Sequence, residues 1–418
     1  KGGLKVTTTL DLDLQEYAQA TVAGEVNKLK SLRVSNGAAL VTRPGTGEIL
    51  AMVGSHDFFD EENDGNVNVT LALRQPGSAI KPINYAAGLG KGVVPPASPF
   101  VDKPPCFLNP GQKPYCPVNY DGRFHGVVQL RFALGNSYNI PAVKMLKANG
   151  VADMIATASA MGITSFSDPS RYGLSLTLGG GEVTMLEMAQ AFGVFANGGY
   201  RVDLAAILKV EDAHGKVLEE YKPPESPFFA KKAIPESVAF LISHILLDNN
   251  ARSAAFGTGS ELVIPGKTVS VKTGTTDDKR DNWTIGFTSS HVVVSWVGNN
   301  DNTPMHPSLA SGTTGAAPIW NRIMRYVLRD WPNESPKKPD TVVGATVCAD
   351  YGNPVTVNEG ETAPCPTRFE YFIKGFMDPQ VKVERQNVLI DNTTGQLAND
   401  GQADNVETKE ETILIDPS

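Results

Sequence analysis

The chain has 418 residues, of which 41% are hydrophobic and 20% charged, and its formal net charge is −8 at pH 7. This describes a globular protein with room for one large domain and a smaller one, whose core needs no metal or crosslink. The negative charge argues against nucleic acid or an anionic membrane surface as the main partner, because clustered cations bind those. No run approaches the roughly 20 apolar residues that span a bilayer, and the start at Lys1 without Met suggests a piece of a longer protein.

Residues 1–35 are expected to form a strand and a first helix that lead into the main body. A β-branched run over 4–9 predicts the strand. Apolar residues at near-helical spacing over 12–29 predict the helix, with Asp11 or Asp13 as its cap.

The main body, residues 36–332, is predicted to be an α+β fold in which helices flank an antiparallel sheet. Strands are predicted at its two ends, over 38–42, 49–53, 269–272, 283–288 and 291–297. The stretch 127–196 is mostly helical in pattern, with glycine-rich breaks, and predicts an all-helical lobe. Distant segments therefore complete one sheet, and helices pack on it.

The composition changes after Trp331, where a Pro- and Lys-rich linker over 333–341 leads into a small β-rich appendage over 342–418. Strands are predicted there near 341–347 and 380–384. From about Asn392 the chain is rich in Asp, Asn, Gly and Glu, and we expect this end to be partly disordered in isolation.

The four cysteines fall into two local pairs, Cys106 with Cys116 and Cys348 with Cys365. Each pair brackets a loop, which predicts two short-loop disulfides and an oxidising compartment outside the cytoplasm; four reduced thiols are the alternative. Neither pair has the spacing of about two to four residues that zinc ligands show. We expect no metal and no cofactor.

The first chemical motif is Ser78-Ala-Ile-Lys81, which follows a Gln75-Pro-Gly break. Pro82 belongs in the first turn of a helix, so a helix is predicted to start near Ser78. The hydroxyl then lies at the positive end of the helix dipole, and Lys81 shares its face. We interpret Ser78 as a nucleophile and Lys81 as its base, a role that needs a lysine pKa lowered by burial and a nearby cation.

The second motif, Ser137-Tyr-Asn139, follows the Gly135-Asn136 break and precedes a helix whose first turn holds Pro141. It is expected on a loop between helices. There the Ser137 hydroxyl can pass a proton between Lys81 and a leaving amine, and the Asn139 amide can hold a peptide backbone.

The third motif, Lys272-Thr-Gly-Thr275, is predicted to end a strand along which an extended peptide can lie, with Gly274 permitting its close approach. Lys272 and the hydroxyls of Thr273 and Thr275 can bind a carboxylate, and Lys272 is the candidate cation beside Lys81. The backbone N–H groups of Ser78 and Thr275 can form an oxyanion hole. We assign Thr273, Gly274, Thr275 and Thr276 to substrate binding.

Each motif alone is weak, but all three in fixed order at the ends of regular elements indicate covalent acyl transfer. The chain resembles the penicillin-binding proteins, specifically the transpeptidase domain of the bifunctional class A enzymes. The resemblance covers about residues 3–330 and includes Thr46-Gly-Glu-Ile-Leu-Ala-Met-Val-Gly, Arg74-Gln-Pro-Gly-Ser-Ala-Ile-Lys-Pro, Leu178-Gly-Gly-Gly-Glu-Val-Thr and Lys272-Thr-Gly-Thr-Thr-Asp-Asp-Lys-Arg-Asp-Asn-Trp.

This resemblance implies that Ser78 attacks the penultimate D-Ala carbonyl of a peptidoglycan stem peptide, releases terminal D-Ala and passes the acyl group to an amine. It implies that Lys81 and Ser137 move protons, that Asn139 positions the acyl-side amide, and that Lys272 anchors the terminal carboxylate. β-Lactams are then expected to trap the serine. Class A enzymes also carry a membrane helix and a glycosyltransferase domain, both outside this chain, which implies an anchored extracytoplasmic protein with cell-wall synthesis partners.

Two other functions stay open at this point. A D-Ala carboxypeptidase or a β-lactamase uses the same acylation residues and then hydrolyses the ester, although no Glu-x-x-Leu-Asn segment follows the second motif to activate water. A non-catalytic sensor or scaffold that binds muropeptides is the alternative of another class.

Three further features are given modest roles. The histidines, His125 among them, are expected in structural or surface positions. Gly179-Gly-Gly181 is expected to be a backbone crossing near the site, and Asp277 to Asp281 a solvated turn with substrate contact as the alternative.

Overall fold

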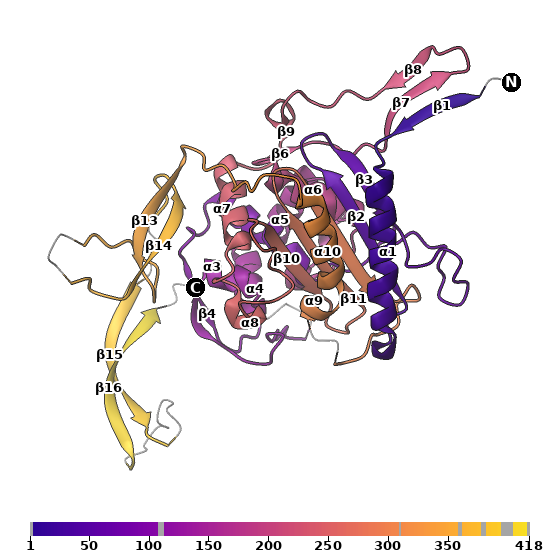
Figure 1. Ribbon diagram of the computed structural model, residues 1–418. Coiled ribbons are helices and arrows are strands. Elements are labelled where there is room, and N and C mark those ends of the chain that lie inside the picture. Colours follow the sequence, from indigo (N-terminus) through magenta and orange to yellow (C-terminus); the bar gives the residue numbers. More distant parts are fainter. Residues whose placement is uncertain are drawn as a thin grey trace.

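A computed structural model describes residues 3–107, 113–308, 311–357, 362–377, 382–393 and 404–415. Its centre is a five-stranded antiparallel sheet in the order β10-β11-β12-β2-β3 (Figure 1). The strands are β2 (Asn36–Arg43), β3 (Glu48–Val53), β10 (Ser270–Thr275), β11 (Asp281–Phe287) and β12 (Val292–Gly298). The two ends of the body thus meet in one sheet, which confirms the predicted α+β class.

Helices cover both faces of this sheet. On one face, α1 (Leu12–Lys28) and α10 (Ala316–Leu328) lie side by side (Figure 1). On the other face, α6 (Met185–Ala196) packs on the central strands, and α7 (Glu236–Leu247) contacts β10. Successive residues of β12 enter opposite cores, because side chains alternate along a strand.

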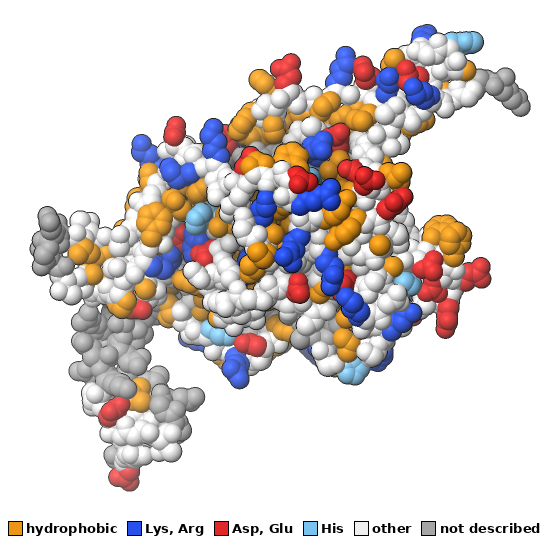
Figure 2. Space-filling view, viewed as in Figure 1, with side chains coloured by type: hydrophobic (Ala, Val, Ile, Leu, Met, Phe, Trp, Pro, Cys, Tyr) orange, Lys and Arg blue, Asp and Glu red, His pale blue; other side chains and the backbone are white. Residues whose placement is uncertain are grey.

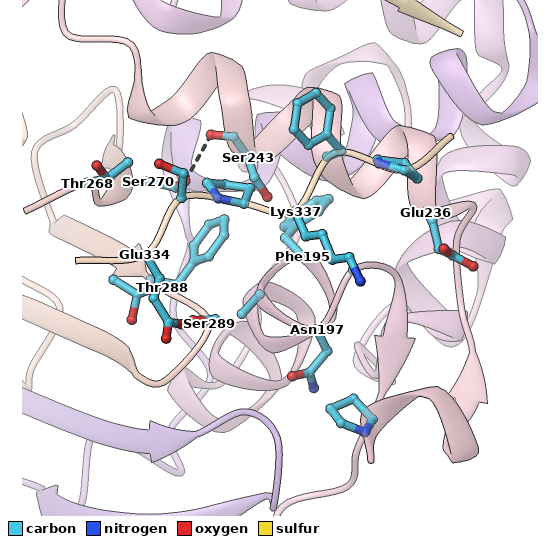
Figure 3. Close-up of a pocket in the computed structure, with 18 of the residues that line it drawn as sticks. Phe195, Asn197, Glu236, Ser243, Thr268, Ser270, Thr288, Ser289, Glu334 and Lys337 are labelled. Carbon is cyan, nitrogen blue, oxygen red and sulfur yellow. Dashed lines mark hydrogen bonds between the residues drawn. The ribbon is translucent and has the colours of Figure 1, made fainter. Parts of the chain in front are cut away.

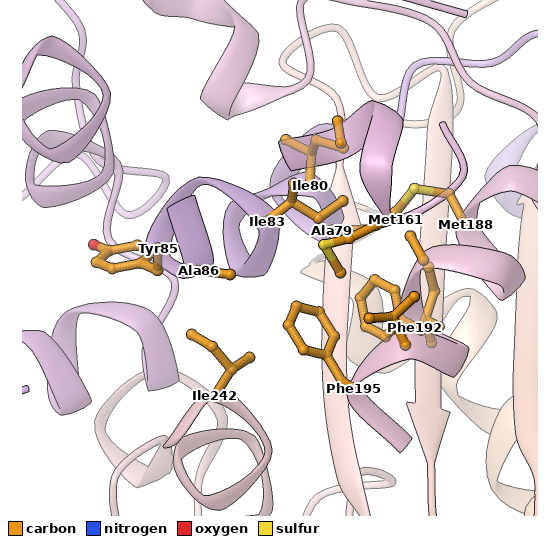
Figure 4. Close-up of a cluster of buried hydrophobic side chains, with 14 of the residues drawn as sticks. Ala79, Ile80, Ile83, Tyr85, Ala86, Met161, Met188, Phe192, Phe195 and Ile242 are labelled. Carbon is orange, nitrogen blue, oxygen red and sulfur yellow. The ribbon is translucent and has the colours of Figure 1, made fainter. Parts of the chain in front are cut away.

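The helical lobe surrounds α2 (Lys81–Lys91), which is buried along nearly its whole length. Its other helices are α3 (Leu130–Gly135), α4 (Asn139–Asn149), α5 (Val151–Ala160) and α8 (Ser253–Phe256). Figure 4 shows Ile80 and Ile83 packing toward aromatic and sulfur-containing side chains that include Phe192 and Met161. The short α9 (Ser311–Thr314) precedes α10.

The predicted lobe boundary at residue 127 is wrong by a few positions. Residues 126–129 form strand β5 (Gly126–Gln129), which pairs with β4 (Pro99–Asp102), and the first helix begins at Leu130. The two adjacent β-branched residues Val127 and Val128 favour a strand, and the partner that pairs with them lies far away in the sequence.

The N-terminal segment follows the prediction, with β1 (Leu4–Thr8) followed by α1, whose first turn is capped by the Asp11 carboxylate. β1 pairs with β7 (Ile207–Asp212), which pairs with β8 (Val217–Glu220), in a small sheet that extends away from the body (Figure 1). The remaining short elements are β6 (Tyr200–Arg201), β9 (Lys231–Lys232), η1 (Lys30–Leu32), η3 (Pro169–Arg171), η4 (Leu174–Leu178) and η5 (Pro227–Phe229).

The C-terminal appendage consists of two strand pairs on the opposite side of the body from that small sheet (Figure 1). The strands are β13 (Val342–Cys348), β14 (Thr367–Ile373), β15 (Lys382–Asp391) and β16 (Val406–Ile415). Within the end that was expected to be partly disordered in isolation, residues 406–415 form β16, which pairs with β15 along its length. The rest of that prediction, over 394–403 and 416–418, and the first two residues of the strand predicted at 380–384 lie outside the described residues.

Disulfides join Cys106 to Cys116 and Cys348 to Cys365, the pairs that the sequence predicts. In the described part of the chain, no helix has both the length and the apolar character to cross a membrane. On the face drawn in Figure 2, basic and acidic side chains are intermixed over the body.

Candidate active site

Ser78 lies on a tight 3-10 turn, η2 (Gly77–Ile80), which packs against the end of β10. The α-helix starts three residues later than Ser78, because α2 begins at Lys81 with Pro82 in its first turn. The turn and the strand touch through two glycines. A Cβ on Gly77, whose φ is +52°, would lie 2.5 Å from the Thr275 carbonyl oxygen, and a Cβ on Gly274 would lie 2.1 Å from the Pro76 carbonyl oxygen.

Gly274 therefore has a packing role that the sequence did not predict, while its contact with substrate stays a prediction. The backbone that comes close to it is that of Pro76, directly before the turn that holds Ser78. The Gly179 backbone presses on the same turn, since a Cβ there would lie 2.3 Å from the Gly77 nitrogen. Gly179 thus forms the predicted backbone crossing, and the Trp283 indole steadies the turn by donating to the Gln75 carbonyl at 2.9 Å.

Lys81 is fully buried directly behind the second motif. Its Nζ donates to the Asn139 Oδ1 at 2.7 Å and to the Tyr138 carbonyl at 3.2 Å, and it lies 3.5 Å from the Ser137 Oγ. Burial, followed by the positive charge of Lys272, holds the pKa of Lys81 well below its ordinary value, and the Asp277 charge opposes this only in part. A neutral amine at neutral pH is the form that can accept a proton.

Lys272 approaches the same hydroxyl from the sheet side. Its Nζ donates to the Ser137 Oγ at 2.8 Å and to the Thr273 carbonyl at 2.8 Å. Burial lowers the pKa of Lys272 to about 7. The Ser137 hydroxyl consequently lies between two buried amines from different parts of the fold.

The Ser137 backbone has φ +63°, in the left-handed region that non-glycine residues seldom adopt. This turn separates α3 from α4, as the sequence predicts, and aims the hydroxyl at both lysines. The Asn139 amide is engaged at both ends, because its Oδ1 accepts from Lys81 and its Nδ2 donates to the Val118 carbonyl at 2.7 Å. The predicted peptide contact would have to replace or share one of these bonds.

Five of the predicted residues line one cavity of about 380 Å³: Ser78, Ser137, Asn139, Thr273 and Thr275. Lys81 and Lys272 are buried, and their amines lie 3.5 and 2.8 Å from the Ser137 Oγ. β10 is the edge strand of the central sheet, so the outer side of its backbone is open to an added extended chain. That opening fits the predicted oxyanion hole at the Ser78 and Thr275 N–H groups, which stays a prediction.

Thr276 does not line this cavity. It is 4% exposed, and its Oγ1 accepts from the backbone N–H groups of Arg280 and Asp281 at 2.9 and 3.0 Å. Its hydroxyl thus shapes the turn between β10 and β11, and its predicted part in substrate binding stays a prediction. A threonine hydroxyl that closes a turn and one that contacts a ligand look alike in a sequence.

The wall opposite β10 comes from a segment that the sequence analysis did not assign to the site. Tyr120, Asp121 and His125, which precede β5, line the cavity beside the second motif. The nearest signal was the Cys106–Cys116 pair just upstream, which indicates an ordered loop but no function. Asp277 also lines the cavity, which favours substrate contact over the purely solvated turn.

A second cavity, of about 330 Å³, lies at the other end of β10 and contains none of the motif residues. Phe195, Phe240 and Phe287 line it, and the segment 334–339 covers one side (Figure 3). There the Ser270 hydroxyl donates to the Ser243 carbonyl at 2.9 Å, which ties β10 to α7 (Figure 3).

The first cavity brings together groups that acyl transfer needs: the Ser78 hydroxyl lines it, and the Ser137 hydroxyl lies between the buried amines of Lys81 and Lys272. The family model for the penicillin-binding protein transpeptidase domain matches residues 37–325. The chain belongs to this family of transpeptidase domains.

Several relatives share the match. Penicillin-binding protein 1A of Neisseria lactamica is 33% identical over 344 residues, which is 79% of this chain and 41% of that protein. The protein of the same name from Rickettsia prowazekii is 31% identical over 331 residues, or 75% of this chain and 41% of the relative. This chain therefore spans about two fifths of the length of the curated relatives it matches.

Solved structures share the fold. Penicillin-binding protein 1A from Haemophilus influenzae matches with a TM-score of 0.75 and 23% identity, over 90% of this chain and 73% of that one. PonA1 from Mycobacterium tuberculosis, in complex with penicillin V, matches with a TM-score of 0.65 and 22% identity, over 81% of this chain and 89% of that one.

Proposed function

We propose that this chain is a D,D-transpeptidase that cross-links peptidoglycan stem peptides through an acyl-enzyme on Ser78. The observation that carries this proposal is the Ser137 hydroxyl, which lies between the buried amines of Lys81 and Lys272 at the wall of the cavity that holds Ser78. Two lysines buried beside one another keep a base available at neutral pH, which a serine nucleophile requires.

In the first half-reaction, the neutral Lys81 amine takes the Ser78 proton while Oγ attacks the penultimate D-Ala carbonyl. The N–H groups of Ser78 and Thr275 stabilise the oxyanion. The proton returns through Ser137 to the leaving amine, the C–N bond breaks, and terminal D-Ala departs. In the second half-reaction an acceptor amine attacks the ester carbonyl, its proton passes through Ser137 and Lys81 to the Ser78 Oγ, and the ester C–O bond breaks to give the new amide and free Ser78.

The carboxylate of terminal D-Ala is assigned to Lys272, Thr273 and Thr275. All three belong to the edge strand β10, and both threonines line the cavity. A bound carboxylate favours the charged form of Lys272, whose pKa is otherwise about 7, so substrate binding itself supplies the cation that this role needs.

β-Lactams are proposed as inhibitors that acylate the same serine. A structural relative of this chain, PonA1, has been solved in complex with penicillin V. Because this chain spans about two fifths of the length of the curated relatives it matches, we propose that it belongs to a longer protein with a membrane anchor and a glycosyltransferase domain. We also propose an extracytoplasmic location and other cell-wall synthesis proteins as partners.

The test is to expose the protein to benzylpenicillin and follow its intact mass over hours. A persistent adduct that is absent from Ser78→Ala and retained by the exposed-site control Ser170→Ala supports the acyl-enzyme. If the wild-type protein forms no adduct, the proposed chemistry is wrong and a non-catalytic binding role is favoured. Rapid loss of the adduct favours a hydrolase.

A second assay separates cross-linking from hydrolysis after acylation. The protein is incubated with a stem peptide that ends in D-Ala-D-Ala, with and without an amine acceptor. A joined peptide product supports transpeptidation, whereas release of D-Ala without any joined product identifies a carboxypeptidase.

A further inference from the structure

Three polar side chains outside the motifs form one connected network behind the second motif. Asp102 ends β4 and is fully buried, Asn119 is 2% exposed, and His125 directly precedes β5. Asp102 and His125 therefore lie at the paired ends of the β4–β5 hairpin, and Asn119 lies on the loop between these strands.

The Asp102 carboxylate organises this network. It accepts from the Asn119 Nδ2, at 2.9 Å for Oδ1 and 2.7 Å for Oδ2, and from the His125 backbone N–H at 3.0 Å. The His125 Nδ1 lies 2.7 Å from Asp102 Oδ2, and its Nε2 lies 3.1 Å from Asp121 Oδ2. Because the Asn119 Nδ2 donates to the carboxylate, the Oδ1 of the same amide points away from it.

The free end of that amide caps the helix on which the second motif sits. Asn119 Oδ1 accepts from the backbone N–H of Asn139 at 2.7 Å and lies 3.4 Å from that of Ile140. These groups open α4, and the Tyr138 side chain at the N-cap position makes no capping bond. Since α4 has no side-chain cap of its own, its first N–H group is satisfied by the Asn119 Oδ1, from a residue 20 positions upstream.

The network and its neighbouring residue Val118 contact the second motif, Ser137-Tyr-Asn139, at two other points. The His125 ring stacks on the Tyr138 ring, with centroids 3.9 Å apart and planes 17° apart. The Asn139 Nδ2 donates to the carbonyl of Val118, the neighbour of Asn119. Ser137, which directly precedes these two contacts, has a φ of +63°. This conformation costs about 1–2 kcal/mol and persists only when the surrounding structure holds it.

We propose that Asp102, Asn119 and His125 are positioning residues, which hold the Ser137 hydroxyl between Lys81 and Lys272 and thereby set the rate of acylation. None of the three is assigned contact with the reacting atoms. Because a displacement of about 1 Å can slow an oriented reaction about 100-fold, relaxation of the Ser137 turn should slow proton transfer while most of the binding surface remains.

The inference rests on the proposed acylation of Ser78, and its test uses the same chemistry. A fluorescent penicillin is mixed with the protein over a range of concentrations, and the limiting acylation rate and the apparent dissociation constant are measured separately. Thermal unfolding of each variant gives its folded fraction. The variants are Asn119→Ala, His125→Ala and His125→Gln, with His214→Ala on the exposed β7–β8 turn as the matched control.

Asn119→Ala and His125→Ala are expected to lower the limiting rate per folded molecule about 10- to 100-fold, with a smaller change in the dissociation constant. His125→Gln should recover part of the rate, since its amide can still donate to Asp102. If Asn119→Ala or His125→Ala does not fold, Asp121→Ala at the half-exposed outer end of the network should still slow acylation severalfold.

Equal limiting rates in folded variants and wild type overturn the inference, even if the variants melt earlier, because a purely structural network affects stability alone. If the wild-type protein is not acylated at all, the proposed function itself is wrong. Acylation of the wild-type protein therefore distinguishes failure of the proposed function from failure of this inference.

Discussion

The active site and the junction with the appendage both bury ionisable groups, but in opposite ways. In the described part of the chain, the side-chain amines of Lys81 and Lys272 contact hydroxyl, amide and carbonyl oxygens and make no ion pair with a carboxylate. At the junction, the fully buried Glu370 of β14 accepts from Arg131 of α3, with a Nε distance of 2.9 Å, and from Arg368 at 2.8 Å.

The pKa shifts follow from this difference. Burial alone would raise the pKa of Glu370, but Arg131 and Arg368 outweigh it and hold the pKa below its ordinary value. Burial lowers the pKa of both lysines, with no carboxylate pair to restore them. Paired buried charges at the junction attach one part of the protein to another, whereas the two amines are buried without an ion pair, at a cost in stability that their proposed role in proton transfer would explain.

The strongest way to test this contrast is to remove the amine assigned as base. Lys81→Met should lower the acylation rate about 1,000-fold, since a positioned general base contributes on the order of 10²–10⁴. The thermal midpoint should stay level or rise, because burial lowers the pKa of this amine and folding therefore opposes the protonation that the unfolded chain favours. Stopped-flow acylation and calorimetry measure the two effects, with Lys91→Met as control; a large fall in midpoint would contradict the assignment of Lys81 as a costly functional group.

The reciprocal change is Glu370→Ala at the junction. It leaves the buried Arg131 without its main partner, and truncating one member of a buried pair costs about 3 kcal/mol or more. We expect faster hydrogen exchange in β13 and β14 but an unchanged acylation rate. The control is the exposed Asp350→Ala. A slowed acylation would show that the appendage contributes to catalysis and is more than an attached module.

A pH series distinguishes the two kinds of buried charge. The folded pKa of Lys272, about 7, lies below its ordinary 10.5, so between these values only the unfolded chain holds the proton. Wild-type unfolding free energy should therefore gain about 1.4 kcal/mol per pH unit relative to Lys272→Met in that window, and nothing below it. Denaturant titrations at several pH values measure this, with Lys216→Met as control. Parallel curves for wild type and Lys272→Met would contradict the buried-cation account.

The smallest expected effect on the acylation rate is a difference between the two disulfides. They close loops with sequence separations of 10 and 17, and the chain-entropy account gives each a stabilisation of about 3 kcal/mol. Only Cys106→Ser with Cys116→Ser should also slow acylation, by about threefold, or less than 1 kcal/mol of barrier, because that loop leads into Asn119. Equal acylation rates in the two double variants would limit the first disulfide to a structural role.

Local patterns predicted most of the body. The strands near 283–288 and 291–297 are dense in β-branched and aromatic residues, and Asp11 marks a helix start through capping chemistry. β5 and β16 were missed because their strand character is realised by partners elsewhere in the chain. The packing of Gly274 against Pro76 was not predicted, since that contact comes from a distant segment of the chain.

By itself, the sequence determined the chemistry: which hydroxyls, amines and amide are present, in what order, and at which ends of elements. Spacing of a few residues controls local geometry, so such motifs can be recognised without a fold. Only the tertiary structure decided that one hydroxyl lies between Lys81 and Lys272, that their burial lowers both pKa values, and that Asn119 caps the start of α4. Burial and charge proximity between distant segments are properties of packing, and a linear pattern does not encode them locally.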